Sequence, residues 1–528
     1  MHSAAALLTS AVAMPGIAEE ATRFTDYLEI ALQATTFDVP LLPGVLTRVW
    51  GYKGSVIYGD PASLQTIQNP TRNNPVRLTI RAGLNLQAPP RPARSPYTYL
   101  GPIIRVRRGQ RVRINFTNNL PEATVMHWHG LHVAPEMDAH PSLLVAPGQT
   151  YVYEFDVANR AGTYWFHPHP DGRTAQQVYN GLAGLFVVSD DEEAAAGLPA
   201  GNFDIPLVIQ DRIIDANNQF VYQNGGGMMG NDGLLGDRIL VNGRPDFGLD
   251  VARRAYRLRL LNGSNSRVYK LAWDDGTPLT VIATDGGLLE QAVQRSYVML
   301  APGERMELWA DFSERESGAV MQLRSLQFSG AEMGMGSSGQ ALPNGAPFTV
   351  MNVRVVGRNS EPSPPLTRLS TINRYRLEDA VNRNAPRSFA VSMGMASGGM
   401  RWLLNGRAYQ ETEVAANETV RLNTTEVWEL VNNSTGGMMG MSMVHPLHIH
   451  GLQFQVIERQ IAPQLSAGYE TVRYGYVDEG WKDTVMLMPG ERLRLLLRFE
   501  DFTGMYVYHC HNLEHEDAGM MRNYLVQA

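Results

Sequence analysis

The feature that most constrains this chain is the segment from Met505 to Met521, MYVYHCHNLEHEDAGMM, which holds the only cysteine in 528 residues. Cys510 has a histidine on each side, and His515 and Met520 follow it closely. A thiolate, imidazoles and a thioether make up the His₂Cys set with a weak axial Met that is typical of type 1 copper. The tyrosine-rich start of the segment favours a strand, whose side chains alternate between two faces. We therefore expect the sulfur to face one metal site and the two flanking imidazoles to face another.

Eight histidines occur as four H-x-H pairs, which fall into two sets with matching spacing. In each set an H-x-H-G motif comes first, and a second pair follows a Pro-Gly turn. The distance from the turn is the same in both sets, 20 positions from Pro147 to His167 and 20 from Pro489 to His509. The eight residues are His127, His129, His167, His169, His448, His450, His509 and His511.

H-x-H pairs on strands place both imidazoles on one face, so two such sets can enclose a cluster between them. Eight neutral imidazoles are too many for one ion and suit two or three coppers. The remaining soft ligands are His445, Cys510, His515 and Met520. Isolated histidines are usually surface or satisfied core residues, and we interpret His2, His132 and His140 in that way. Zinc is the main competing metal, but one thiolate beside a histidine-rich cluster does not resemble a structural zinc site.

Three segments of the chain share one strand–turn–strand pattern. The first strands are predicted at 111–119, 256–265 and 427–435, and each is followed by a Pro-Gly turn and a second alternating run. The middle repeat has Met321-Gln322-Leu323 at the position of the second H-x-H pair, and it contains no histidine. With 50 Gly and 31 Pro, the composition favours an all-β, turn-rich fold of sandwich or Greek-key barrel domains.

Changes in composition suggest where the domains begin and end. The stretches 190–202 and 358–366 are typical of linkers. The predicted division is an N-terminal arm at 1–44, a first domain at 45–192, a second at 193–362 and a third at 363–528.

Charge and hydropathy restrict the partners of the chain. The net charge of −7 does not indicate the excess of basic residues that is typical of nucleic-acid-binding proteins. No apolar run approaches the length of a membrane span, and one cysteine excludes an intramolecular disulfide. The first 20 residues have an apolar core and small residues, as an export signal would, but they lack its basic region. We expect an exported, periplasmic or extracellular protein; an ordinary disordered arm is the alternative.

With these motifs in view, the sequence resembles the multicopper oxidase family in its three-domain laccase-like form, the type found among bacterial spore-coat laccases and cuprous oxidases. The motifs are HWHG, HPH, HPLHIHG and HCHNLEHEDAGM, and the likeness covers about residues 45–528. The resemblance implies three cupredoxin-like domains and four copper ions. It also implies that one-electron oxidation of a phenolic or metal-ion reductant is coupled to reduction of O₂ to water. A monomer is expected.

The resemblance also implies a role for each ligand. Type 1 copper would take His445, Cys510, His515 and Met520, and type 2 copper would take His127 and His448. The type 3 pair would take the six others, which are His129, His167, His169, His450, His509 and His511. Electrons would pass from type 1 copper through Cys510 to the cluster. Asp138 and Glu516 match acids that serve proton supply in bacterial relatives, although a solvated or capping carboxylate is the alternative.

Methionines raise the question of the reductant. Met438, Met439, Met441 and Met443 form a cluster that ends two residues before His445. Thioethers prefer Cu(I), so Met441 and Met443 are candidates for bringing cuprous ions to type 1 copper. Alternatively, the cluster is a pliable apolar loop that accepts varied phenols. The main functional alternative is a dedicated cuprous oxidase or a copper-binding tolerance protein. A two-domain copper nitrite reductase relative is disfavoured by the three repeats.

Overall fold

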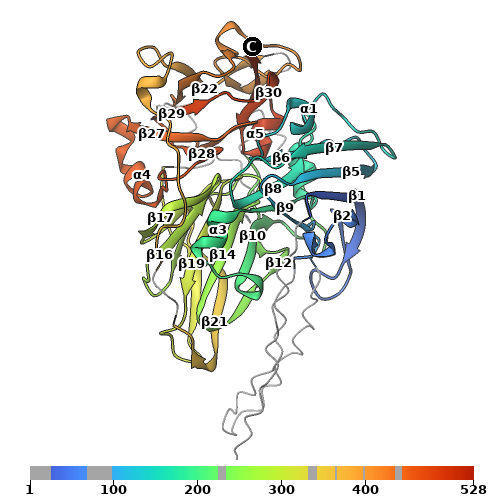
Figure 1. Ribbon diagram of the computed structural model, residues 1–528, viewed down its shortest axis with the longest axis vertical. Helices are drawn as coiled ribbons and strands as arrows, with labels where there is room; N and C mark the ends of the chain where they lie inside the picture. Colours follow the sequence, from blue (N-terminus) through green and yellow to red (C-terminus); the bar gives the residue numbers. More distant parts are fainter. Residues whose placement is uncertain are drawn as a thin grey trace, which may run out of the picture.

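The computed structural model describes residues 25–67, 98–223, 233–330, 342–362, 366–396, 399–433 and 443–528. In these residues the chain forms three β domains, each built from two sheets. Figure 1 shows the third domain in orange and red at the top, the second in green and yellow below it, and the first in blue and cyan beside both. None of the helices in the described ranges is both long and apolar enough to cross a membrane.

The first domain has a four-stranded sheet of order β2-β1-β5-β7 and a five-stranded sheet of order β3-β4-β9-β8-β6. Its strands are β1 (Tyr27–Val39), β2 (Thr47–Tyr58), β3 (Leu64–Gln65), β4 (Ile103–Arg107), β5 (Arg111–Asn119), β6 (Met126–His129), β7 (Thr150–Asp156), β8 (Gly162–Pro168) and β9 (Gly184–Ser189). Its helices are α1 (Pro135–Asp138) and α2 (Thr174–Tyr179), and α3 (Asp191–Ala196) leads into the second domain.

The second domain pairs a seven-stranded sheet, β12-β11-β10-β14-β19-β16-β17, with a five-stranded one, β13-β21-β20-β15-β18. Its strands are β10 (Asp204–Arg212), β11 (Arg238–Val241), β12 (Arg244–Pro245), β13 (Gly248–Arg253), β14 (Ala255–Asn262), β15 (Tyr269–Trp273), β16 (Leu279–Thr284), β17 (Gly287–Arg295), β18 (Val298–Leu300), β19 (Arg305–Asp311), β20 (Val320–Ser325) and β21 (Phe348–Ser360).

The third domain has two five-stranded sheets, β23-β22-β25-β29-β27 and β24-β31-β30-β26-β28. Its strands are β22 (Arg387–Ala396), β23 (Gly399–Leu404), β24 (Thr419–Arg421), β25 (Thr425–Asn432), β26 (His445–Ile449), β27 (Phe454–Ile461), β28 (Thr484–Leu487), β29 (Glu491–Arg498), β30 (Gly504–Cys510) and β31 (Met521–Gln527). Its helices are α4 (Ser466–Glu470) and α5 (Leu513–Asp517).

The three predicted strand–turn–strand repeats are confirmed. In each domain the predicted pair is antiparallel, as β5 with β7, β14 with β19 and β25 with β29. The first strand of each pair also lies parallel to an earlier strand, β1, β10 or β22. Alternating apolar side chains close a separate core in every domain. The all-β fold class and the cupredoxin-like domains expected from the sequence are therefore correct.

The predicted N-terminal arm of residues 1–44 is too long. Strand β1 begins at Tyr27 and lies between β2 and β5 in the first sheet. Its alternating Leu28, Ile30 and Leu32 are fully buried, because their side chains pack in the core of the first domain. The predicted export signal lies in residues 1–20, outside the described part of the chain. At the first predicted linker, 190–202, the chain forms the short helix α3.

Candidate copper centres

The four H-x-H pairs meet at a seam between the first and third domains. Adjacent antiparallel strands bring one histidine of each pair opposite one histidine of another pair. His127 on β6 lies opposite His167 on β8, and His448 on β26 lies opposite His509 on β30. All eight side chains are fully buried. The predicted cluster between two histidine faces is thus present as a geometric feature of the described residues.

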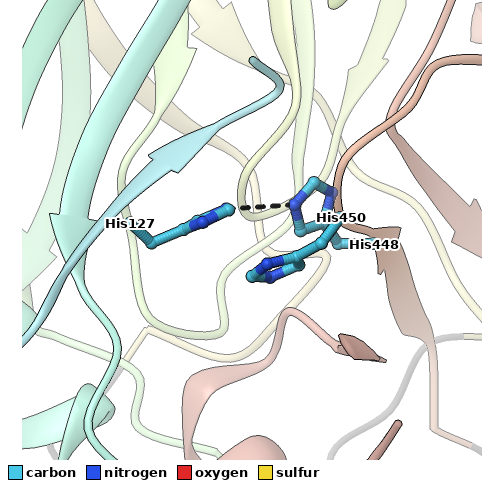
Figure 2. Close-up of side chains that lie close together, drawn as sticks. All are labelled: His127, His448 and His450. Carbon is cyan, nitrogen blue, oxygen red and sulfur yellow. Dashed lines mark hydrogen bonds between the residues drawn. The ribbon is translucent and has the colours of Figure 1, made fainter. Parts of the chain in front are cut away.

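His127 and His448 face each other across the seam, with their Nε2 atoms 3.4 Å apart (Figure 2). The other nitrogen of each ring makes a hydrogen bond to a backbone carbonyl, which fixes the orientation of the ring. His127 Nδ1 donates to the Asp138 carbonyl at 2.9 Å, and His448 Nδ1 donates to the Asp483 carbonyl at 2.8 Å. A neutral imidazole that donates through Nδ1 has only a lone pair on Nε2. Two lone pairs therefore point at each other, an arrangement that fits a shared cation.

A second group contains His169, His450 and His509, whose ring nitrogens lie close enough to share one ion. The Nε2 atom of His509 is 3.2 Å from that of His169 and 3.1 Å from that of His450. Two imidazole nitrogens bound at about 2.0 Å to one ion would be separated by roughly 2.9–3.4 Å. The observed separations match this range, so the group fits a metal ion of ordinary ligand geometry.

The third part of the cluster involves His129, His167 and His511. Nδ1 of His129 lies 3.4 Å from Nε2 of His167. The His511 ring lies beside both, with centroids 4.9 Å from His129 and 5.3 Å from His167, and neither of its nitrogens has a hydrogen-bond partner. A fully buried imidazole without partners is costly unless a ligand satisfies it. This observation also favours a bound metal.

The soft-ligand site lies on the opposite face of β30. Sγ of Cys510 is 3.6 Å from Nδ1 of His445 and 3.7 Å from Nδ1 of His515. Met520 is buried in the same core, and its carbonyl accepts a hydrogen bond from the Cys510 N–H at 3.0 Å. The Trp402 ring packs over the two imidazoles, at centroid distances of 4.9 and 4.6 Å. The predicted separation of the sulfur from its flanking imidazoles is confirmed.

Burial sets the protonation of these groups. It lowers the pKa of His445 to about 3 and, with smaller effects from neighbouring groups, that of His169 to about 4. Burial and nearby imidazoles also hold a set of pKa values well below the usual range, those of His127, His129, His167, His448, His450 and His511. Burial raises the pKa of the Cys510 thiol, and a bound metal ion would instead hold it as thiolate. Neutral imidazoles and one soft sulfur form a donor set that suits copper.

The two predicted acids both contact the histidine cluster. Asp138 is buried, and its Oδ2 accepts from His450 Nδ1 at 2.7 Å. Burial raises the pKa of Asp138 well above the usual range. Burial also acts to raise the pKa of Glu516, but His509 and His169 outweigh it and lower that pKa to about 2. The Glu516 carboxylate lies 3.0 Å from Nδ1 of His509.

Helix α5 fixes His515 and Glu516 at the junction of all three domains. The Asn512 side chain caps the helix by accepting from the His515 N–H. Asp517 accepts from the first two N–H groups of α2 in the first domain, both at 2.9 Å. Glu514 accepts from Asn265 and Ser266 of the second domain, at 2.8 and 2.5 Å. These bonds fix the orientation of α5, and with it the soft-ligand site relative to the cluster.

Two of the predicted site residues are methionines. Met443 is 1% exposed and packs in the same core as Cys510 and Met520. Met441, with Met438 and Met439, lies outside the described residues. Sequence analysis did not single out Asp483 or Trp402. No motif identifies either of them, because their contacts with the histidines form only when distant segments come together.

Comparison with known proteins places these motifs in a family. Two family models, both described as multicopper oxidase, match residues 97–193 and 380–528. The chain is 32% identical over 422 residues to a multicopper oxidase of Staphylococcus aureus. The aligned region covers 80% of this chain and 81% of that relative. It is 29% identical over 474 residues to a laccase of Bacillus subtilis. That aligned region covers 80% of this chain and 87% of the laccase.

A solved structure has the same overall fold. The multicopper oxidase from Campylobacter jejuni, described as a metallo-oxidase, superposes with a TM-score of 0.71 at 25% sequence identity. The superposition covers 98% of this chain and 95% of that protein.

Proposed function

This chain belongs to the multicopper oxidase family, and from that premise we propose that the seam and the Cys510 site are the copper centres of a laccase-like oxidase. The observation that carries the proposal is the division of β30 into two faces. Cys510 lies among His445 and His515, whereas the neighbouring His509 lies among the cluster histidines. One strand thereby provides a short covalent path between two centres.

The oxidase has four copper ions, one of type 1, one of type 2 and two of type 3. When bound, they accept single electrons from a reductant and deliver them to O₂. The residues proposed to hold type 1 copper are His445, Cys510, His515 and Met520, and those proposed for type 2 copper are His127 and His448. The six residues proposed for the type 3 pair are His129, His167, His169, His450, His509 and His511.

Asp138 is the residue proposed to deliver protons at the cluster. Its Oδ2 bonds His450, whereas its Oδ1 has no hydrogen-bond partner, so it can hold and release a proton beside the histidines. Asp138→Asn keeps the shape of the side chain but removes this proton. We expect reduction of O₂ to slow by about 10²-fold or more, with the blue absorption unchanged. Stopped-flow reoxidation of the reduced protein measures the rate.

The matched control for Asp138→Asn is Glu136→Gln, which changes an exposed acid on the same helix α1. The control should reoxidise at the wild-type rate. Loss of the blue absorption in Asp138→Asn, with an unchanged reoxidation rate, would contradict the proton-delivery role. Glu516, which contacts His509 and His169, is proposed to assist in the same step.

The reductant is proposed to be either a phenol or a low-valent metal ion. Support for Cu(I) comes from the position of Met443 in the core that holds Cys510 and Met520, and from a relative described as a metallo-oxidase. Met441 precedes Met443 by two residues. A role limited to copper binding or tolerance is less well supported, because storage requires no connection between two sites.

The methionine proposal makes a specific prediction. Replacing Met438, Met439 and Met441 with leucine keeps these side chains apolar but removes three thioethers. We expect Cu(I) oxidation to fall by at least about tenfold, because thioethers favour Cu(I), whereas oxidation of 2,6-dimethoxyphenol should change little. Oxygen uptake with each reductant measures both activities. Equal losses for both reductants would argue against a copper-specific role.

The proposed function is tested by steady-state oxygen uptake with Cu(I), Fe(II), Mn(II), 2,6-dimethoxyphenol and bilirubin, each with and without added Cu(II). The expected result is turnover with at least one of them and consumption of four one-electron donors per O₂. No turnover with any donor by fully copper-loaded protein would overturn the proposal. We also propose a monomer, and export on the basis of the apolar stretch in the first 20 residues.

A further inference from the structure

The second domain carries none of the proposed copper ligands, yet one of its turns reaches the cluster. This turn, Ala301–Arg305, ends at the first residue of β19 and matches residues 146–150 of the first domain and 488–492 of the third. Arg492, at the last position of the third turn, has a side chain 48% exposed to solvent. Arg305 holds the same position in the second turn but is fully buried. The repeat without histidines therefore places a charged side chain where the other repeats meet.

Arg305 uses all five of its N–H donors at this junction. Nε donates to the Thr163 carbonyl of the first domain at 3.1 Å. Nη1 and Nη2 donate to the carbonyls of Gly303 and Asp285, both at 3.0 Å. The two remaining donors form a fork with Asp483 of the third domain, in which Nη1 lies 2.6 Å from Oδ1 and Nη2 contacts Oδ2. A bidentate fork fixes the carboxylate in orientation as well as position.

The carboxylate of Asp483 in turn decides which nitrogen of His129 faces the cluster. Nε2 of His129 lies 3.0 Å from Oδ1 of Asp483 and also 3.0 Å from Oγ1 of Thr484, whose hydroxyl donates to the same carboxylate, so Nε2 is the donor. Nδ1 then carries the lone pair, and it points toward His167 at 3.4 Å. Other cluster histidines have the opposite arrangement and donate through Nδ1, namely His127, His167, His448, His450 and His509. The Asp483 carboxylate, together with the Thr484 hydroxyl bound to it, thus favours the tautomer of His129 that a ligand requires.

The same turn also packs against His511. Gly303 has φ +83°, and a Cβ at this position would lie 2.9 Å from two ring atoms of His511. Ordinary contacts to a Cβ are longer than this, so any other residue would displace the ring. Glycine at 303 therefore allows the backbone of the second domain to pack directly against this imidazole.

We propose that the Ala301–Arg305 turn is a positioning element for one type 3 copper. It orients His129 through Arg305 and Asp483, and it sets the place of the His511 ring through Gly303. The inference rests on the proposed ligand assignment and extends it to a domain that supplies no ligand. It predicts that changes in this turn alter the type 3 pair and leave type 1 copper intact.

The first test compares Gly303→Ala with Gly148→Ala, its counterpart in the first domain. Both glycines have similar left-handed backbones, at φ +83° and +79°, but a Cβ at 148 meets nothing within 4 Å. The two variants therefore share the backbone strain, and only Gly303→Ala displaces His511. We expect Gly303→Ala to lose the near-ultraviolet band and the magnetic coupling of the type 3 pair. Gly148→Ala should keep both, and the blue absorption should persist in each.

The second test replaces Arg305 by methionine or lysine, with Arg492→Met as control. We expect Arg305→Met to bind type 3 copper about 10–100-fold more weakly, as measured by copper retention against a chelator. Arg305→Lys keeps the charge but loses the fork, so it should recover the affinity only in part. Arg492→Met should match wild type. Electron paramagnetic resonance reports on the type 3 coupling, and the blue absorption reports on folding of the third domain.

The outcomes separate this inference from the function on which it rests. Wild-type protein with far fewer than about four copper ions would refute the proposed function itself. Normal copper content and coupling in Gly303→Ala and in Arg305→Met would refute the positioning role alone. If Arg305→Met does not fold, the comparison of Gly303→Ala with Gly148→Ala decides the question, because neither substitution changes a charge.

Discussion

Replacing Cys510 with serine should abolish the blue absorption and reduce oxidation of every reductant to background. The hydroxyl is close in size to the thiol but is a hard, protonated group that does not replace a thiolate on copper. The site would keep His445 and His515, which lie 3.6 and 3.7 Å from the sulfur, but lose its strongest ligand, the thiolate that would join the metal to the backbone of β30. Visible spectroscopy and oxygen uptake measure the two losses.

The variant should still fold and still bind copper at the seam. None of the eight cluster histidines contacts the sulfur in the described structure, since Cys510 points to the opposite face of β30. The near-ultraviolet band of the type 3 pair is therefore the internal control and should remain. Retention of substantial oxidase activity by Cys510→Ser would show that electrons reach the cluster by another route.

Removing the copper should lower the unfolding temperature sharply. The seam brings imidazole lone pairs of the first and third domains within 3.2–3.4 Å of one another, and these contacts are favourable only with a cation between them. An ion that binds only the folded state at about 1,000 times its Kd stabilises it by about 4 kcal/mol. Scanning calorimetry of the chelated and reloaded protein measures the difference.

Copper should restore the original unfolding temperature, whereas Mg²⁺ should not, because Mg²⁺ prefers oxygen ligands. The loss should fall mainly on the contact between the first and third domains, where His127 faces His448. Identical unfolding temperatures with and without copper would mean that the ions do not hold this seam together.

Much of the fold and the site could be predicted from the sequence because the relevant signals are local. A period of two on β30 separates Cys510 from its neighbours whatever surrounds the strand. Likewise, the repeated strand–turn–strand pattern depends on alternating apolar residues and a Pro-Gly turn. Strand β1 was missed because it follows a stretch that resembles a disordered arm, and its partners β2 and β5 are not evident from its own sequence.

Contacts between distant segments could not be predicted in this way. Arg305 lies 178 positions from Asp483, and Asp483 lies 354 positions from His129. His129 belongs to a motif, but Arg305 and Asp483 are ordinary charged residues at the beginning of a strand and directly before one. These residues come together only when the three domains pack. The contribution of the second domain to the site could therefore be recognised only in the structure.

Anomalous diffraction at the copper edge from crystals of the copper-loaded protein tests the central claim most directly. The two faces of β30 predict one peak beside Sγ of Cys510, between His445 and His515, and three peaks among the eight seam histidines. A single peak, or peaks that fall on only one face of the strand, would contradict the account.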